Sequence, residues 1–561
     1  MNIKKLLIIF CLVLILLGIG FRVVSLNNEI TGEEADFVNP AIALIETGHP
    51  LFYHSEQQPL ELALWHPPTY IMTLSLLMRF GESEIILRSL NFIFVILTAF
   101  LIYLFCYKII GEEKGKWIGL ISCAFFMINY YVFSSSVIID IDILSMFFTF
   151  GFIYSILRYH QEHKKFHFYL SYFFLLFSIG NRYPMAFLIY VGIGIYYFFN
   201  KEFKKDFYDY FKIGLISFFS FVIIWGIYSI FIEPGNFFSF LIHNANIGGS
   251  QFSTLGIYLG SFFLNIAQFI RLLTFPVVIL MCWSFFYFLK RKSNLVNILL
   301  IYSLVILIFF FLVPRPAFGY PRYFATILPA IFILIGMFIY SNLKKINMDK
   351  KEIVIVIICF LISIILLLIL NPQPTIYNSA GLIKATNFPD FLMNIFASIP
   401  FMGVLFIDKR KRRTTLILIL VLLSLSYSGY FITKNVMYES HIKEVGIYLQ
   451  EHTQEEDVVI CPKAIGYYFG GKFYINDHDK PLLNFSSKYL FEYFKKSFEN
   501  SEMNDSFFWP NGIYSGIVEP IPKEEALEKS KYVVKYYPVE GFEPEVKIGE
   551  FYIYNLEQLT I

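Results

Sequence analysis

Long apolar runs alternate with short charged loops along most of this chain. A helix needs about 20 apolar residues to cross the hydrocarbon core of a membrane, and by this measure the pattern predicts about thirteen spans. The predicted spans cover residues 6–26, 84–107, 117–137, 142–157, 166–180, 183–199, 211–232, 263–289, 294–313, 323–340, 352–370, 391–407 and 414–432. The fold class that we expect is therefore an all-α polytopic membrane domain.

Lysine and arginine gather in every second loop between these runs. The basic clusters lie at residues 4–5, 108–116, 158–165, 201–205, 290–292, 344–351 and 409–413. Because cytoplasmic loops carry the excess of positive charge, the N-terminus is predicted to be cytoplasmic. The odd number of spans then places the C-terminus outside, in a multi-pass protein of the plasma membrane.

The composition changes to mixed charge after about residue 433. A helix is predicted at about 440–452, and short β-rich runs follow it at 457–460, 472–475, 532–535 and 551–554. A tail of this length is sufficient for one small domain. We therefore expect a transmembrane domain over residues 1–432 and a soluble extracytoplasmic α/β domain over residues 433–561.

The overall composition agrees with a membrane protein, since 57% of the residues are hydrophobic and only 16% are charged. The net charge of +2 is too small for a nucleic-acid partner, whose phosphates require a dense basic surface. The six cysteines lie almost all inside apolar runs, without the spacing of a metal site or a disulfide framework. Membrane lipids are thus the partners that composition predicts.

Three carboxylates follow the first predicted span, at the start of an outer loop over residues 27–83. In one interpretation, Thr31 and Glu34 form a capping box that opens a short helix, and the other acids are solvated. In the other, Glu33 faces a partly buried cavity and takes a proton from an attacking hydroxyl, with Asp36 on the same helical face. Glu33 is the preferred base because capping would occupy Glu34.

The same loop contains a second apolar segment, residues 68–80, which is too short to cross a membrane. It predicts an interfacial helix beneath the acidic stretch. The motif Trp65-His66-Pro67-Pro68-Thr69-Tyr70 precedes it, and its consecutive prolines fix a rigid entry into that helix. His66 is then either merely exposed or binds a sugar hydroxyl or a donor phosphate, and Tyr70 is a further candidate for substrate binding.

Asp140 and Asp142 stand in a predicted outer turn between two spans. They either cap the following helix or help the acid of the first loop to orient an acceptor or bind a metal. An isolated Asp-x-Asp is a weak metal signal, because a Mg²⁺ or Mn²⁺ site needs a geometry that spacing does not define. The sequence therefore predicts no cofactor, and it neither requires nor excludes a divalent metal.

Arg182 and Arg322 lie at the predicted outer ends of spans, unlike the other basic clusters, and a tyrosine follows each. They are either anchors that extend to the membrane surface or bidentate clamps on a phosphate. Tyr323 and Tyr320 are candidate partners in the same pocket, and Arg315 is a weaker third cation. A carboxylate base and a phosphate-binding cation on one outer surface are what transfer from a lipid-phosphate donor requires.

These candidates belong to an ordered set of short motifs within residues 1–340. The motifs are Glu33-Glu34, Ala35-Asp36 through Ala43, Thr47-Gly48-His49-Pro50, His66-Pro67-Pro68-Thr69-Tyr70, Leu87-Arg88, Ile139 to Leu144, Gly180-Asn181-Arg182-Tyr183-Pro184 and Pro321-Arg322-Tyr323. As a set they resemble the GT-C membrane glycosyltransferases, and most of all the branch of protein O-mannosyltransferases and aminoarabinose lipid A transferases. Where that family usually has Asp-Glu in its first loop, this chain has Glu33-Glu34.

The resemblance implies a polyprenyl-phosphate-linked sugar donor, an active site at the outer membrane face, an inverting single displacement and an exported soluble tail. The acceptor hydroxyl belongs to a glycan, a lipid or a protein, as in protein glycosylation or lipid A modification of the cell envelope. Asp142 resembles the acid that follows the third span of the family, and Arg182 stands where relatives often have Lys-Tyr. The expected roles are catalytic for Glu33, Glu34 and Asp142, phosphate-binding for Arg182, Arg322 and Tyr323, and substrate-binding for Asp36, His66, Tyr70, Asp140 and Tyr320.

Two other classes of membrane protein share some of these features. A transporter or flippase also has many spans, but it usually places ionisable residues near the bilayer midplane within repeated halves. This chain instead concentrates its acids in an outer loop, and no repeat is evident. A polymerase or ligase of lipid-linked glycans would keep the outer site and use a different donor, with the loop at 233–262 as a possible substrate contact.

Overall fold

The computed structural model describes residues 3–47, 69–232, 266, 269–270, 272–290, 293–312, 321–343, 350–370, 412–437, 440–454, 457–469, 474–476, 506–507, 521–522, 530–535, 538–539 and 542–556. These residues form two compact units. The membrane unit contains the described residues of Met1–Leu26, Asn91–Thr375 and Ala385–Met437. The loop–tail unit contains those of Asn27–Leu90 and Tyr438–Ile561.

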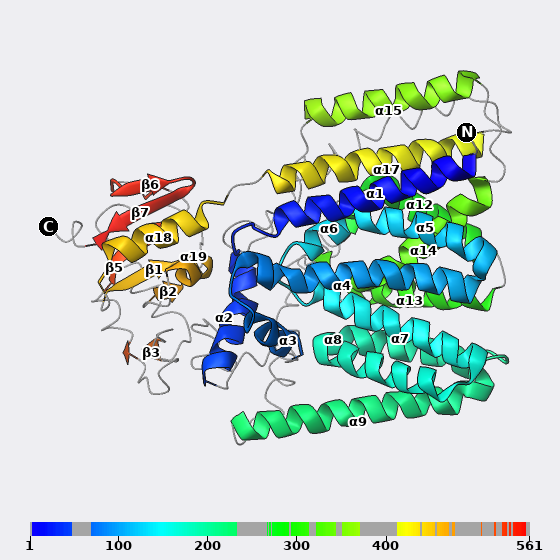
Figure 1. The fold of residues 1–561 in the computed structure, drawn as a ribbon, viewed down its shortest axis with the longest axis horizontal. Helices are drawn as coiled ribbons and strands as arrows, with labels where there is room; N and C mark the ends of the chain where they lie inside the picture. Colours follow the sequence, from blue (N-terminus) through cyan, green and yellow to red (C-terminus); the bar gives the residue numbers. More distant parts are fainter. Residues whose placement is uncertain are drawn as a thin grey trace. The chain divides into compact units, whose positions relative to one another are not determined.

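The membrane unit is helical, and most of its helices run along one common direction (Figure 1). The helices are α1 (Ile3–Ser25), α4 (Glu84–Phe105, whose first residues belong to the loop–tail unit), α5 (Glu112–Ile128), α6 (Tyr130–Ser136), α7 (Asp142–Glu162), α8 (Lys165–Phe199), α9 (Phe207–Ile232), α12 (Phe275–Leu289), α13 (Asn294–Leu312), α14 (Leu328–Leu343), α15 (Lys350–Leu370) and α17 (Arg412–Val436). A π-helical turn η1 (Cys106–Ile110) and the 3₁₀ segments η2 (Lys204–Asp206) and η3 (Pro321–Ile327) lie between them.

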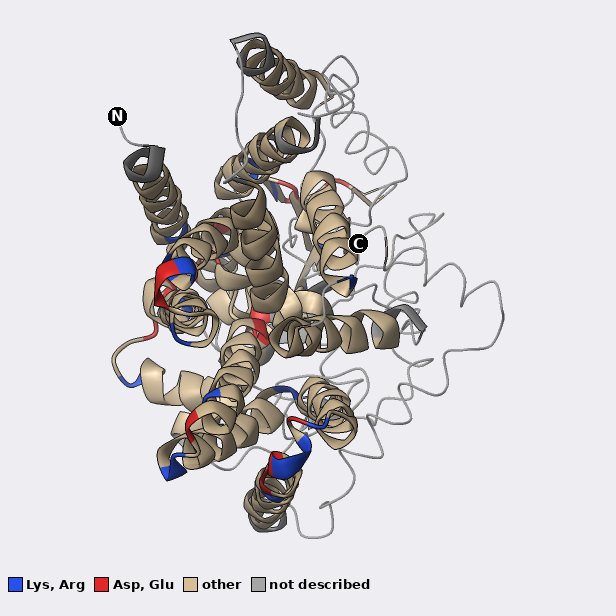
Figure 2. Cartoon of the chain, turned by 90° about the vertical axis from the view of Figure 1, so that its right-hand side faces the viewer, with Lys and Arg blue, Asp and Glu red and all other residues tan. Residues whose placement is uncertain are grey.

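The helices of this unit have the composition of membrane spans. Six of the described helices are long and apolar enough to cross a membrane, or seven if α5 and α6, bent by 62°, form one span. Charged residues gather mainly at helix ends (Figure 2). The chain is thus an integral membrane protein with a multi-span helical fold, as predicted. The expected number of about thirteen spans stays a prediction, since segments such as 391–407 lie outside the described residues.

The long helix α8 reverses its direction at Arg182, whose backbone is non-helical (φ −150°, ψ 77°). A straight helix of 35 residues would be about 52 Å long, so its two ends could not meet one neighbour. However, His167 near the start of α8 lies 3.3 Å from the Glu162 carboxylate, and the Tyr197 ring near its end lies 6.3 Å from the His160 ring. Both ends of α8 therefore reach the end of α7, and its two arms coincide with the two spans that the sequence predicts here.

The predicted span at 117–137 is broken at Asn129, between α5 and α6. The extended backbone of Asn129 (φ −68°, ψ 134°) interrupts the helix, and its side chain accepts a hydrogen bond from the Tyr131 N–H at 3.0 Å. Arg22 of α1 donates to the Met127 carbonyl beside the break at 2.7 Å. Because these side chains satisfy backbone groups that the break exposes, the bend is tolerated inside an apolar unit.

The loop–tail unit combines helices of residues 27–83, which are predicted to form the first outer loop, with the C-terminal sheet. Its helices are α2 (Gly32–Thr47), α3 (Thr69–Met78), α18 (Ile442–His452) and α19 (Lys463–Tyr468). The strands are β1 (Val458–Cys461), β2 (Tyr474–Asn476), β5 (Ser530–Lys535), β6 (Val546–Ile548) and β7 (Phe551–Asn555), in the order β2-β1-β5-β7-β6, with a separate antiparallel pair of β3 (Ser506–Phe507) and β4 (Ile521–Pro522). β1 is parallel to β2 and β5, whereas β7 is antiparallel to β5 and β6.

Alternate residues of the strands and one face of α18 form the core of this unit. The buried cluster contains Ile442, Val445, Leu449, Val459, Cys461, Ala464, Ile465, Phe469, Tyr532, Val534, Phe551 and Ile553, together with Ala43 of α2. The spacing of two along the strands and of three or four along α18 explains why these positions share one interior. The predicted helix and strands of the tail are thus present.

The first outer loop contributes to the same core as the tail, through Ala43. The sequence instead grouped residues 27–83 with the transmembrane domain 1–432. Local periodicity shows which residues of α2 are apolar, but it does not show which distant segment covers them. The domain boundary at residues 432–433 stays a prediction, with the first outer loop now placed beside the tail.

Candidate functional site

The Glu34 carboxylate accepts the backbone hydrogen bond that a capping box with Thr31 predicts. The box places Thr31 at the N-cap of α2, and the Glu34 carboxylate accepts a hydrogen bond from the Thr31 N–H at 2.7 Å. The Thr31 hydroxyl has no hydrogen-bond partner in the part of the chain that the structure describes. Glu34 is only 1% exposed, so this acid is not solvated at a surface.

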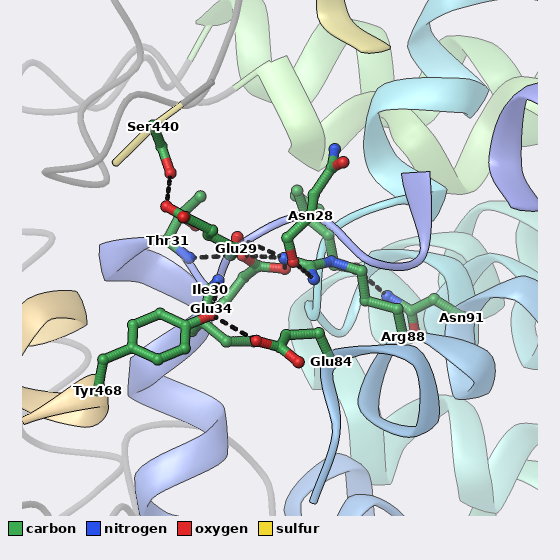
Figure 3. A network of polar contacts seen from close by, with 11 residues as sticks. Asn28, Glu29, Ile30, Thr31, Glu34, Glu84, Arg88, Asn91, Ser440 and Tyr468 are labelled. Atoms are coloured by element: carbon green, nitrogen blue, oxygen red, sulfur yellow. Dashed lines mark hydrogen bonds and ion pairs between the residues drawn. The ribbon is translucent and has the colours of Figure 1, made fainter. Parts of the chain in front are cut away.

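Arg88 of α4 holds Glu34 and the chain that leads into α2 (Figure 3). Its Nη2 lies 2.8 Å from each Glu34 carboxylate oxygen and 2.8 Å from the Glu29 carbonyl oxygen. Its Nη1 donates to the Asn28 carbonyl. The guanidinium is buried, as is the carboxylate. Arg88 thus joins the start of α4 to the entry of α2.

Sequence reasoning named Arg88 only as part of the Leu87-Arg88 motif and gave it no role. The available signal was a cation inside an apolar run, since such a residue is costly to bury without a partner. Two of its partners are backbone carbonyls, which no sequence pattern displays. The Arg88–Glu34 pair could not be predicted, because the two residues lie 54 positions apart along the chain.

Glu33 and Asp36 occupy the first turns of α2, on either side of Glu34. Their spacing of three places them on one helical face. Their side chains are outside the described residues, so the catalytic role of Glu33 and the substrate-binding role of Asp36 stay predictions. The observed engagement of Glu34 by Arg88 and Thr31 agrees with the reasoning that favours Glu33 as the base.

The helix predicted at residues 68–80 is present as α3, and it packs against α2. Its interfacial position stays a prediction. Tyr70 is fully buried, and its ring lies 5.2 Å from the Phe37 ring in an edge-to-face arrangement. Tyr70 therefore contributes to α2–α3 packing, while its role in substrate binding stays a prediction. His66 lies outside the described residues, and its role also stays a prediction.

Asp140 and Asp142 are both buried at the start of α7. The Asp140 carboxylate accepts a hydrogen bond from the Ile141 N–H at 2.6 Å, and its carbonyl accepts one from Asn91 at 3.0 Å. Asp142 is the first residue of α7, where the helix dipole favours a carboxylate. Within the described ranges, no three His, Cys, Asp or Glu side chains are grouped as metal ligands would be.

Asp142 forms an ion pair with Arg182 at the reversal of α8. The Arg182 side chain is 6% exposed and the Asp142 side chain is fully buried. Arg182 is therefore a buried, paired cation rather than an anchor at the membrane surface. The sequence singled out both residues for chemistry, but their separation along the chain gave no indication that they pair.

The remaining phosphate-binding candidates lie at or beside η3. Arg322 and Tyr323 are in η3, but their side chains are not among those that the structure describes. Tyr320 and Arg315 lie outside the described residues. The predicted convergence of the acids of the first loop with Arg182 and Arg322 stays a prediction.

Known proteins give two kinds of match to this chain. Residues 65–225 match the family described as dolichyl-phosphate-mannose-protein mannosyltransferase. ArnT from Cupriavidus metallidurans, solved bound to undecaprenyl phosphate, matches with a TM-score of 0.52 and 12% identity over 84% of this chain and 86% of that chain. The oligosaccharyltransferase AglB from Archaeoglobus fulgidus, solved with an inhibitory peptide and a dolichol-phosphate, has a TM-score of 0.46 and 11% identity over 95% of this chain and 70% of that chain.

The predicted resemblance to the GT-C membrane glycosyltransferases is confirmed. It rests on the family match and on the fold shared with ArnT over most of both chains. No curated protein sequence matches the chain. At 12% identity the likeness to ArnT concerns the fold, and the roles of single residues stay predictions.

Proposed function

We propose that this chain, whose residues 65–225 match the family described as dolichyl-phosphate-mannose-protein mannosyltransferase, moves a sugar from a polyprenyl-phosphate donor to an acceptor hydroxyl at the outer membrane face. The family match carries the proposal. The matched segment contains the buried charged residues Arg88, Asp142 and Arg182. The acceptor is a glycan, a lipid or a protein.

Glu33 is the proposed general base. The neighbouring Glu34 carboxylate already accepts hydrogen bonds from Arg88 and from the Thr31 N–H, so its oxygens are engaged. Glu33 takes the proton of the acceptor hydroxyl while the hydroxyl oxygen attacks the anomeric carbon of the donor. The bond from that carbon to the phosphate oxygen breaks, and its electron pair leaves with the polyprenyl phosphate. Attack from the opposite face inverts the anomeric configuration.

Arg182 is the proposed ligand of the donor phosphate, with Arg322 and Tyr323 as further ligands. A guanidinium presents five N–H donors in a planar fork, so it can bind a carboxylate and a phosphate at the same time. Asp142, which is ion-paired with Arg182, would then orient the guanidinium toward the phosphate. Such a donor stabilises the leaving phosphate strongly where little water is present.

The proposal is tested with the purified full-length chain in lipid nanodiscs. Undecaprenyl-phosphate-linked mannose and aminoarabinose serve as donors, and a peptide, lipid A and a polysaccharide serve as acceptors. We expect one donor–acceptor pair to yield equal amounts of glycosylated acceptor and free undecaprenyl phosphate by mass spectrometry. We also expect an inverted anomeric configuration by NMR.

The rival classes give different results with the same purified chain, reconstituted in vesicles for the transport assay. A flippase would move the intact lipid-linked sugar across a vesicle bilayer without releasing undecaprenyl phosphate. A polymerase or ligase of lipid-linked glycans would extend or transfer a glycan from a different donor and leave the monophosphate-linked sugars unchanged. Either result, without cleavage of a monophosphate-linked sugar, would contradict the proposal.

A further inference from the structure

The short segment between α1 and α2 is held by residues of the C-terminal tail (Figure 3). The Glu29 carboxylate accepts hydrogen bonds from the Ser440 hydroxyl and from the Ile442 N–H, the latter at 2.7 Å. These partners lie more than four hundred residues from Glu29 along the chain. The first outer loop and the tail are thus joined by a charge-assisted contact.

Glu29 performs a capping function for α18, the first helix of the tail. The N-cap residue of α18 is His441, which adopts a left-handed conformation (φ 55°, ψ 14°) and makes no side-chain capping bond. The N–H groups of the first helical turn need acceptors, and the helix dipole favours a negative charge there. Glu29 supplies both the acceptor and the charge for the Ile442 N–H.

Tyr468 of α19 makes a second contact with the same segment. Its hydroxyl accepts a hydrogen bond from the Ile30 N–H at 2.7 Å and donates one to the Glu84 carboxylate at 3.1 Å. Burial raises the pKa of the Tyr468 phenol far above its usual value, so the hydroxyl keeps the proton that it donates. Lys443 of α18 also contacts Glu84, at 2.8 Å.

The first turns of α4 link these tail contacts to α2. Glu84 and Arg88 are four residues apart and so lie on one face of α4. Glu84 is bonded to the tail, whereas Arg88 is bonded to the carbonyls of Asn28 and Glu29 and to the Glu34 carboxylate. α4 therefore holds this segment through the carbonyls of Asn28 and Glu29. The tail holds it through the Glu29 side chain and the Ile30 N–H.

We infer that the tail is a positioning device for α2, and that Glu29 and Tyr468 are positioning residues for the transfer reaction. The inference rests on the proposed function, in which α2 carries the base at Glu33. Loss of either contact would loosen the entry of α2 and misalign the base. Turnover of bound substrate would then fall, while donor affinity would stay unchanged, because neither residue is a proposed donor ligand.

A matched control distinguishes positioning from general stabilisation of the tail. The Tyr448 hydroxyl donates to the Glu545 carboxylate at 2.8 Å, within the tail itself. Tyr448→Phe and Tyr468→Phe each remove one hydroxyl that donates to a carboxylate. Only the second variant removes a contact with residues 28–31.

The experiment measures amide hydrogen exchange and transfer kinetics on the full-length chain in nanodiscs. For Tyr468→Phe we expect exchange across residues 28–36 to accelerate about tenfold, as the loss of one buried hydrogen bond implies. We expect kcat to fall by a similar factor, with an unchanged KM for the undecaprenyl-phosphate-linked donor. Tyr448→Phe is expected to leave exchange at residues 28–36 and kcat as in the unaltered chain.

Glu29→Gln is the second variant, in case Tyr468→Phe fails to fold. We expect it to accelerate exchange at residues 28–36 and in the first turn of α18 together. Unchanged exchange at residues 28–36 in the folded variants would overturn the inference, as would equal acceleration in Tyr448→Phe. If exchange accelerates as expected but the unaltered chain cleaves no lipid-linked sugar, the tail still holds α2, and the proposed function is what fails.

Discussion

Arg88 and Arg182 are both buried beside a carboxylate, but they are bound to different kinds of group. Arg88 contacts two backbone carbonyls as well as Glu34, so its guanidinium fixes the path of the chain into α2. Arg182 lies where α8 reverses, and its ion pair with Asp142 joins two side chains. The comparison shows that burial beside a carboxylate does not by itself define a role. Arg88 is bonded to the backbone that enters α2, whereas the phosphate-binding role of Arg182 stays a proposal.

Replacing the two arginines should therefore have different effects on stability and on transfer. Breaking a buried pair by removing one partner leaves a charge without compensation in a region of low dielectric. At Arg88 the loss also leaves backbone carbonyls without their donor, so stability should fall. Removing the guanidinium of Arg182 would also leave Asp142 buried without its partner. Only a variant that keeps the positive charge therefore separates the proposed loss of the phosphate ligand from a loss of stability.

Arg88→Met gives the largest expected effect. Removing this guanidinium leaves the Glu34 carboxylate buried without its ion-pair partner. The cost is about 3–5 kcal/mol of the free energy of unfolding of the loop–tail unit. Pulse proteolysis of the full-length chain measures that change. The double variant Arg88→Met with Glu34→Gln should regain part of the loss, because it removes the unpaired charge. Normal stability of Arg88→Met with abolished transfer would instead place Arg88 among the ligands.

Arg182→Lys is expected to have a large effect on catalysis and a small one on stability. The lysine keeps the charge opposite Asp142 but loses the planar fork, so kcat/KM should fall about 10²–10³-fold. Asp142→Asn serves as the partner variant and should lower kcat/KM by less, since Arg182 remains. Transfer rates with an undecaprenyl-phosphate-linked sugar provide the measurement. Full activity of Arg182→Lys would show that Arg182 is structural in the same way as Arg88.

Ser440→Ala gives the smallest expected effect. It removes one of the two donors to Glu29 and leaves the Ile442 N–H bonded. The free energy of unfolding of the tail should fall by about 0.5–1.5 kcal/mol. Chemical denaturation followed by hydrogen exchange in α18 measures this change. A loss as large as that of Arg88→Met would mean that the tail, rather than α4, mainly supports the entry of α2.

The helices of the membrane unit could be predicted because each span carries its own signal. Apolar length located α1, α4 and α9, and the short polar turn at Asn181-Arg182 separated the two arms of α8. The tail helix and the longer strands were predicted for a similar reason. β6 and α19 were not predicted. The six residues of α19 are too few for a clear helical period, and β6 alternates only one charged residue between two apolar ones.

The candidate site was only partly predictable. The sequence identified three of the buried charged residues as candidates because they lie next to apolar runs. These are Glu34, Asp142 and Arg182. The Thr31–Glu34 contact was predicted as a capping box. The ion-pair partners Arg88 and Arg182 were not predicted for Glu34 and Asp142, because an ion pair depends on which distant segments meet. Glu29 shows this limit clearly. In the sequence, Glu29 does not differ from the other acids of the predicted outer loop. Only the fold shows that its carboxylate caps α18, more than four hundred residues further along the chain.

The most direct test of the central claim compares Glu33→Gln with the unaltered chain. Undecaprenyl phosphate binding and thermal unfolding show whether the variant keeps its donor site and its fold, and transfer is measured in the same preparation. The account predicts unchanged binding and unfolding with transfer reduced about 10²–10⁴-fold, the usual contribution of a general base. Full transfer by Glu33→Gln would contradict the account.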